Sequence, residues 1–176
     1  MRNTTIPKLL FACLLLFFTV KLTAQTPEFT LDDTLRGSIT PQRAWWDLTF
    51  YDLKVKVNLD DKSITGSNTI HYKVLTPNNL LQIDLQPPLR MERVEQDGKL
   101  LELRQAGKNA YFVVIQKEQP VGSKQSITVW YSGRPREAIH APWDGGFSWS
   151  KDEKGQPFVA TSCQGLGASV WWPCKD

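Results

Sequence analysis

Short runs in which apolar and polar residues alternate extend from Trp45 to Tyr131, and they constrain the fold more than any other feature of the sequence. Successive side chains of a β-strand point to opposite faces, so this alternation predicts strands with one buried face. The apolar positions of the first two predicted strands are Leu53, Val55, Val57 and Leu59, then Ile64, Ile70, Tyr72 and Val74. His71 falls on the polar face of the second strand, which indicates a solvated side chain.

Turn signals separate these runs. They lie at 60–63, 76–79, 97–98 and 106–109, and Asp97-Gly98 is the pair that a tight hairpin turn favours because both residues tolerate positive φ angles. No segment shows a helical period, whereas turns about every 8 to 12 residues are typical of all-β domains. The sequence therefore predicts an all-β fold of the sandwich type, with curved antiparallel or mixed sheets.

Residues 1–24 have the three parts of a secretory signal peptide. Arg2 and Lys8 give a positive start, Leu9–Val20 is an apolar run, and Ala24 is a small residue before the expected cleavage site. The apolar run is shorter than the about 20 residues that a membrane-spanning helix needs. We therefore expect an exported chain, periplasmic or secreted, whose mature form has no membrane span.

Removal of the signal peptide changes the charge balance. The whole sequence has 21 Lys and Arg against 18 Asp and Glu. Arg2, Lys8 and Lys21 lie in the signal peptide, which contains no acidic residue, so the mature chain has 18 basic and 18 acidic residues. A balanced chain offers no basic surface of the kind that attracts nucleic acid or anionic lipid. Neither is expected as a partner.

The mature chain divides into two parts. Residues 25–42 carry Thr, Pro, Asp and Ser without periodicity and predict an extended leader, and residues 43–176 are long enough for one β domain. Within the domain, 143–150 and 157–161 predict two paired strands. This hairpin leads the chain into its final segment.

The final segment, Ser162–Asp176, crowds glycines, cysteines and adjacent tryptophans together without a strand or helix period. Gly165 and Gly167 permit backbone angles that other residues resist, and Pro173 favours an extended residue before it, so a shaped loop is expected. Loops on a rigid scaffold often carry function. The alternative is a turn followed by an edge strand that buries its tryptophans. Cys163 and Cys174 are candidates either for a disulfide or for two free thiols.

Common catalytic patterns are missing from the sequence. Its two histidines, His71 and His140, are far apart and do not form a His-Glu-x-x-His motif, so no metal site is predicted. There is also no Gly-x-Ser-x-Gly element of the kind that presents a nucleophilic serine. The residues alone describe a β domain without its own catalytic constellation.

Three stretches resemble the aminopeptidase N family of zinc metallopeptidases, the gluzincins that include the leukotriene hydrolases. They are Asp52–Asp60 with Ile64–Ser67, then Trp143–Phe147, and the segment that runs from Thr161-Ser162-Cys163-Gln164 to Pro173-Cys174-Lys175-Asp176. The resemblance covers roughly residues 45–176. It implies the saddle-shaped amino-terminal β domain that packs on a zinc-binding catalytic domain in this family.

The resemblance also implies an activity for the whole enzyme, which is zinc-dependent removal of amino-terminal residues from peptides. The family's Gly-x-Met-Glu-Asn and His-Glu-x-x-His motifs are not in this sequence. We therefore expect a chain truncated before the catalytic domain, inactive alone and without bound zinc. Gln164 matches the position where family members place Gln or Glu near the substrate's amino terminus, and the alternative is a side chain that caps loop amides.

Two other function classes remain open at this stage. The first is a stand-alone binding module for a glycan or protein partner, in which Trp143, Trp149, Trp171 and Trp172 form an exposed stacking platform. The second is a structural or assembly domain that uses an open sheet edge.

Overall fold

The computed structural model describes residues 28–176. The predicted signal peptide, residues 1–24, lies outside the described residues. None of the helices within 28–176 is both long enough and apolar enough to cross a bilayer.

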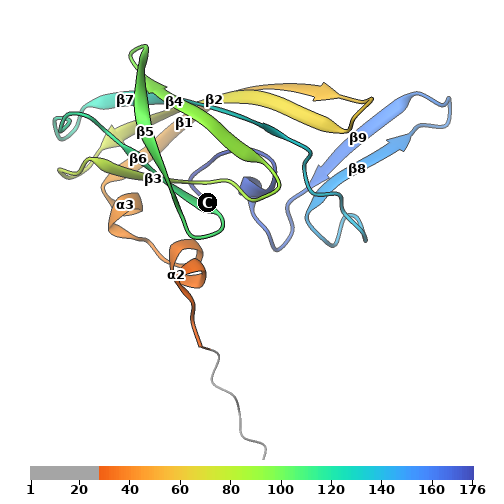
Figure 1. Ribbon diagram of the computed structural model, residues 1–176, viewed down its shortest axis with the longest axis horizontal. Coiled ribbons are helices and arrows are strands. Elements are labelled where there is room, and N and C mark those ends of the chain that lie inside the picture. The colour runs from red at the N-terminus through yellow and green to blue at the C-terminus, as the bar shows by residue number, and fades with distance from the viewer. Residues whose placement is uncertain (1–27) are drawn as a thin grey trace, which may run out of the picture.

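Seven antiparallel strands form the main sheet, in the order β1-β2-β7-β4-β5-β6-β3 (Figure 1). Two further strands form a separate hairpin sheet. The strands are β1 (Trp46–Asn58), β2 (Ser63–Val74), β3 (Leu80–Asp84), β4 (Arg90–Gln96), β5 (Lys99–Ala106), β6 (Ala110–Val114), β7 (Lys124–Gly133), β8 (Gly146–Lys151) and β9 (Pro157–Ser162). The predicted all-β fold of curved sheets is confirmed, and every strand pairing is antiparallel.

The main sheet curls so that its β5-β6-β3 side folds over the inner face of β1, β2 and β7 (Figure 1). Side chains from both sides of the curl therefore meet in one core. Ile64 and Ile70 of β2, Leu81 of β3 and Val113 of β6 are all fully buried members of it. The β8-β9 hairpin projects from one end of the curl, and the two short helices lie beneath the curled sheet (Figure 1).

The predicted alternation is confirmed on β2, where Ile64, Ile70, Tyr72 and Val74 are all buried. On β1 the prediction is only partly right. Leu53 and Val55 are half-buried, but Val57 is 41% exposed and Leu59 is 47% exposed. The reason is position, because β1 is an edge strand whose only neighbour is β2, and its far end extends past the core.

The turn predicted at Asp97-Gly98 joins β4 to β5. Both residues have positive φ angles, 50° and 73°, as a type I′ turn requires. Strand β6 lies inside the sheet, with β5 on one side and β3 on the other.

The expected extended leader is wrong for much of its length. Helix α2 spans Leu31–Gly37 and helix α3 spans Pro41–Ala44. Helix α2 begins with a capping box, in which the Thr30 hydroxyl accepts from the Asp33 backbone N–H (3.3 Å) and the Asp33 carboxylate accepts from the Thr30 N–H (2.9 Å). A single Thr-x-x-Asp pattern is a weak signal, and the two helices are too short to show a period.

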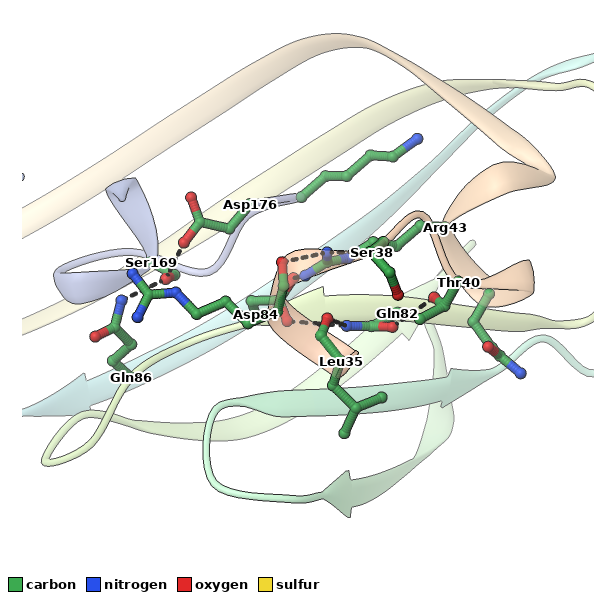
Figure 2. Close-up of polar contacts among 12 residues, drawn as sticks. Leu35, Ser38, Thr40, Arg43, Gln82, Asp84, Gln86, Ser169 and Asp176 are labelled. Atoms are coloured by element: carbon green, nitrogen blue, oxygen red, sulfur yellow. Dashed lines mark hydrogen bonds and ion pairs between the residues drawn. The ribbon is translucent and has the colours of Figure 1, made fainter. Parts of the chain in front are cut away.

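A buried ion pair ties these helices to β3. Arg43 and Asp84 are each only 4% exposed, and Arg43 Nη2 lies 2.5 Å from Asp84 Oδ2 (Figure 2). Arg43 Nη1 also donates to the carbonyl oxygens of Arg36 and Ser38, both at 3.2 Å. These carbonyls belong to the last turn of α2 and to its C-cap residue, where a helix lacks internal partners.

Gln82 completes the connection. Its Nε2 donates to the Leu35 carbonyl oxygen and to Asp84 Oδ1, both at 3.0 Å, and its Oε1 accepts from the Thr40 hydroxyl at 2.7 Å (Figure 2). Buried polar groups are tolerated when they are hydrogen-bonded in this way. The helical segment is therefore an integral part of the domain.

Arg43→Met is expected to lower the free energy of unfolding by about 3 kcal/mol near neutral pH, because removing one partner of a buried pair leaves an uncompensated charge. Urea denaturation measures the loss. The matched control is Arg104→Met, which breaks the pair with Glu102 on the surface, where Arg104 is 60% exposed. That change is expected to cost less than about 1 kcal/mol.

The loss in free energy of unfolding caused by Arg43→Met is also expected to depend on pH. Burial raises the pKa of the Asp84 carboxyl, and Arg43 opposes this rise, so loss of Arg43 raises that pKa further. A carboxyl with a raised pKa in the folded state favours folding at low pH and loses this contribution as pH rises through that pKa. The difference in free energy of unfolding between the variant and the parent protein should therefore be smaller at about pH 5 than at about pH 7. An equal difference at the two pH values would contradict this account.

Candidate functional site

The final segment forms a shaped loop, as predicted. After β9, the backbone N–H groups of Leu166 and Gly167 both donate to the Cys163 carbonyl oxygen, at 3.1 and 2.9 Å. Gly165 and Gly167 have φ angles of 70° and 76°, in the region that favours glycine. A short 3-10 helix, η1 (Ala168–Val170), follows the loop. The alternative, an edge strand carrying the tryptophans, is not formed.

The segment then returns to β3, inside the curl of the sheet. The Asp84 N–H donates to the Cys174 carbonyl oxygen at 2.8 Å, and the Cys174 N–H donates back to the Asp84 carbonyl oxygen at 3.1 Å. Asn68 Nδ2 of β2 donates to the Pro173 carbonyl oxygen at 2.8 Å. Figure 1 shows the C-terminus in the middle of the molecule, beneath the sheet.

The aromatic residues of this region pack against one another. Trp172 meets Tyr51 edge-on with 4.8 Å between ring centroids, and Trp171 meets Phe147 edge-on at 6.2 Å. Trp149 stacks on Phe147 at 5.5 Å, and all three tryptophans are half-buried. Trp143 alone among the four candidate tryptophans is mostly exposed, at 73%. The four rings therefore do not form a common exposed platform, which disfavours the glycan-binding alternative.

Lys175 anchors the end of the segment to β1. Its backbone N–H donates to the Tyr51 hydroxyl at 2.7 Å, and its Nζ donates to the Trp46 carbonyl oxygen at 2.6 Å. The same ammonium group lies 4.2 Å from the centre of the Trp46 ring, a cation–π contact. Burial lowers the pKa of this lysine and raises the pKa of Tyr51.

Gln164 lies at the outer turn of the loop and is exposed. Within residues 28–176 its side chain makes no hydrogen bond, so the alternative in which it caps loop amides is not seen here. The carbonyl groups that follow it are held from outside the loop. Arg36 Nη2 donates to the Gly165 oxygen at 3.0 Å, and Gln86 Nε2 donates to the Leu166 oxygen at 2.5 Å.

Cys163 and Cys174 are free thiols in the structure, the first half-buried and the second buried. Burial raises the pKa of the Cys174 thiol, and the neighbouring carboxylates of Asp176 and Asp84 raise it further. The disulfide between the two stays a prediction.

The two histidines do not come together. His71 lies on the outer face of β2, with its ring centroid 5.8 Å from that of Phe50, and His140 is exposed in the loop before β8. In the described part of the chain, no three His, Cys, Asp or Glu side chains gather as metal ligands.

Sequence patterns missed the polar residues that hold the loop and the helices. Gln82, Asp84 and Gln86 alternate with the apolar residues of β3, and this pattern predicts a solvated face. In the structure all three are buried, because the helices and the final segment cover that face. In the sequence, their spacing of two residues is the only sign that the three side chains share one face of the strand.

Residues 48–176 match the model of the Peptidase M1 N-terminal domain. The chain belongs to this family. The predicted resemblance to the aminopeptidase N group is thereby confirmed. No curated protein matches the sequence.

Solved structures of M1 enzymes share the fold of this M1 domain. The M1 zinc metallopeptidase from Deinococcus radiodurans gives a TM-score of 0.54 at 19% identity, over 76% of this chain and 30% of that chain. Yeast leukotriene A4 hydrolase in complex with bestatin gives a TM-score of 0.58 at 15% sequence identity, and the match covers 99% of this chain and 25% of that chain. The M1 domain therefore spans between 25% and 30% of the length of these two relatives.

The two thiols are expected to differ in reactivity when the protein is produced from residue 25 onward. Cys163 should react with a thiol reagent such as Ellman's reagent in the native state, whereas Cys174 should react only after unfolding, because its thiolate is disfavoured by burial. Cys163→Ser should abolish the native reaction and Cys174→Ser should not. Absence of any reaction until a reductant is added would instead indicate the disulfide.

Proposed function

We propose that this M1 domain forms one wall of the substrate pocket in a zinc-dependent aminopeptidase that removes amino-terminal residues from peptides. The match of residues 48–176 to the M1 N-terminal domain carries the proposal. The loop geometry supports it, because Gln164 is exposed at a turn whose backbone is held from two sides.

Gln164 would accept a hydrogen bond from the ammonium group of the peptide substrate. Its amide oxygen is a suitable acceptor, and it adds no second carboxylate next to the groups that bind the metal. The described residues of this chain offer no zinc ligand set, so a peptidase domain would supply the metal and the chemistry of peptide hydrolysis. This chain would supply orientation of the substrate.

We propose in addition that the enzyme is exported to the periplasm or secreted. The basis is the signal-peptide pattern of residues 1–24.

In the aminopeptidase that contains this domain, Gln164→Ala is expected to raise KM for aminoacyl substrates about tenfold, the cost of losing a hydrogen bond to a charged group. Gln164→Glu keeps an acceptor and should retain substrate binding. Gln156→Ala is the matched control, since Gln156 is an exposed glutamine in the β8-β9 turn. Unchanged KM in Gln164→Ala would remove this residue from the substrate site.

The chain expressed alone is expected to bind no stoichiometric zinc and to leave aminoacyl reporter substrates uncleaved, because residues 28–176 bring no three His, Cys, Asp or Glu side chains together as metal ligands. Metal analysis of the purified protein and a fluorogenic peptidase assay measure the two properties. Metal-dependent turnover by the chain alone would overturn the assignment of the chemistry to another domain.

A further inference from the structure

We infer that Arg36 and Gln86 act together as a carbonyl clamp that positions the loop carrying Gln164. The clamp consists of these two side chains and the two carbonyl groups they bind. Its role in substrate binding rests on the proposed function, whereas its role in fixing the loop rests on the structure alone.

The two donors bind consecutive carbonyl groups directly after Gln164. Arg36 Nη2 lies 3.0 Å from the Gly165 oxygen, and Gln86 Nε2 lies 2.5 Å from the Leu166 oxygen. Arg36 is 129 positions from Gly165 in sequence, and Gln86 is 80 positions from Leu166. The loop is therefore fixed to two separate parts of the fold.

The loop needs external donors because its own bonds are few. Within the loop, only the Leu166 and Gly167 amides are paired, both to the Cys163 carbonyl. Gly165 and Gly167 have a wide choice of backbone angles, and ordering them costs more entropy than ordering other residues. Fixing two successive peptide carbonyls sets the orientation of the backbone next to Gln164, and hence the direction in which its side chain projects.

Arg36, the first of the two donors, is itself held in place by buried residues. The backbone carbonyl of Arg36 accepts from the buried Arg43, and the carbonyl of Leu35, one residue earlier, accepts from the buried Gln82. This fixes the base of the Arg36 side chain on the β3 side of the sheet. Arg36 precedes the residues matched by the M1 model, which begin at 48. The helical segment that it belongs to thus adds a contact to the site from outside the matched domain.

Gln86 is buried, and its amide nitrogen makes two hydrogen bonds. Besides the Leu166 oxygen, it donates to the Ser169 hydroxyl at 2.8 Å, and Ser169 in turn donates to the Asp176 carboxylate (Figure 2). The Gln86 backbone N–H donates to the Ser169 carbonyl oxygen at 2.8 Å. Gln86 therefore fixes the end of the loop and the start of η1 together.

Amide hydrogen exchange, measured by NMR on this chain, tests the clamp without any enzyme assay. Arg36→Ala is expected to speed exchange of the Leu166 and Gly167 amides about threefold to tenfold, the range for one lost hydrogen bond. Arg36→Lys retains a donor and should restore slow exchange. Gln86→Glu replaces the donor with an acceptor of the same shape and should speed exchange at least as much.

The controls separate a local effect from general destabilisation. Arg134→Ala removes an exposed arginine that has no recorded contact with the loop, and should leave loop exchange unchanged. The Val129 amide in β7 should keep its exchange rate in every variant that folds. Since Arg36 is exposed, Arg36→Ala is expected to fold even if Gln86→Glu does not. Unchanged exchange of Leu166 and Gly167 in Arg36→Ala would overturn the clamp.

Kinetics of the aminopeptidase that contains this domain test the link to substrate binding. Arg36→Ala should raise KM for aminoacyl substrates about threefold with little change in kcat, and Arg36→Lys should restore KM. If Gln164→Ala raises KM but Arg36→Ala does not, the positioning role of Arg36 is wrong. If Gln164→Ala leaves KM unchanged, the proposed function of Gln164 fails, while the exchange data still decide whether the clamp exists.

Discussion

The buried ion pair between Arg43 and Asp84 is the contact on which the rest of the arrangement depends. The Asp84 side chain pairs with Arg43, and Arg43 in turn donates to a carbonyl at the end of α2. The Asp84 backbone pairs with the backbone of Cys174. One residue of β3 thus joins the first and last segments of the described chain. Two charges are buried at a net cost unless they are paired and hydrogen-bonded, so the helices and β3 have to come together for either charge to be tolerated.

This connection explains how a curled sheet can support the exposed loop that carries Gln164. The sheet and its core supply a rigid support, and the aromatic cluster of Trp171, Trp172 and Phe147 fixes the final segment against it. The loop that carries Gln164 is exposed, yet its carbonyl groups are bound by Arg36 and Gln86. The loop is therefore held by Arg36, which belongs to the attached helix α2, and by Gln86, which follows β3.

The sequence predicted the strands well because alternation and turn chemistry are local properties. The Asp97-Gly98 hairpin and the buried positions of β2 follow directly from them. The helices were missed because they are short. The burial of the polar residues of β3 was not predicted because their partners are distant in sequence, as Arg43 is from Asp84, 41 positions away. A glycine-rich loop was predicted from its residues, but Gln164 came from the family resemblance, since no pattern distinguishes a substrate-binding glutamine from an ordinary one.

The central claim is that this domain presents Gln164 to the amino terminus of a peptide. A crystal structure of the proposed aminopeptidase that contains the domain, with a peptide or amino acid bound, tests it most directly. The account predicts that Gln164 Oε1 lies within about 3 Å of the ligand's ammonium nitrogen, the distance of a hydrogen bond. A bound amino terminus that is held entirely by other residues, with Gln164 pointing away from it, would contradict the account.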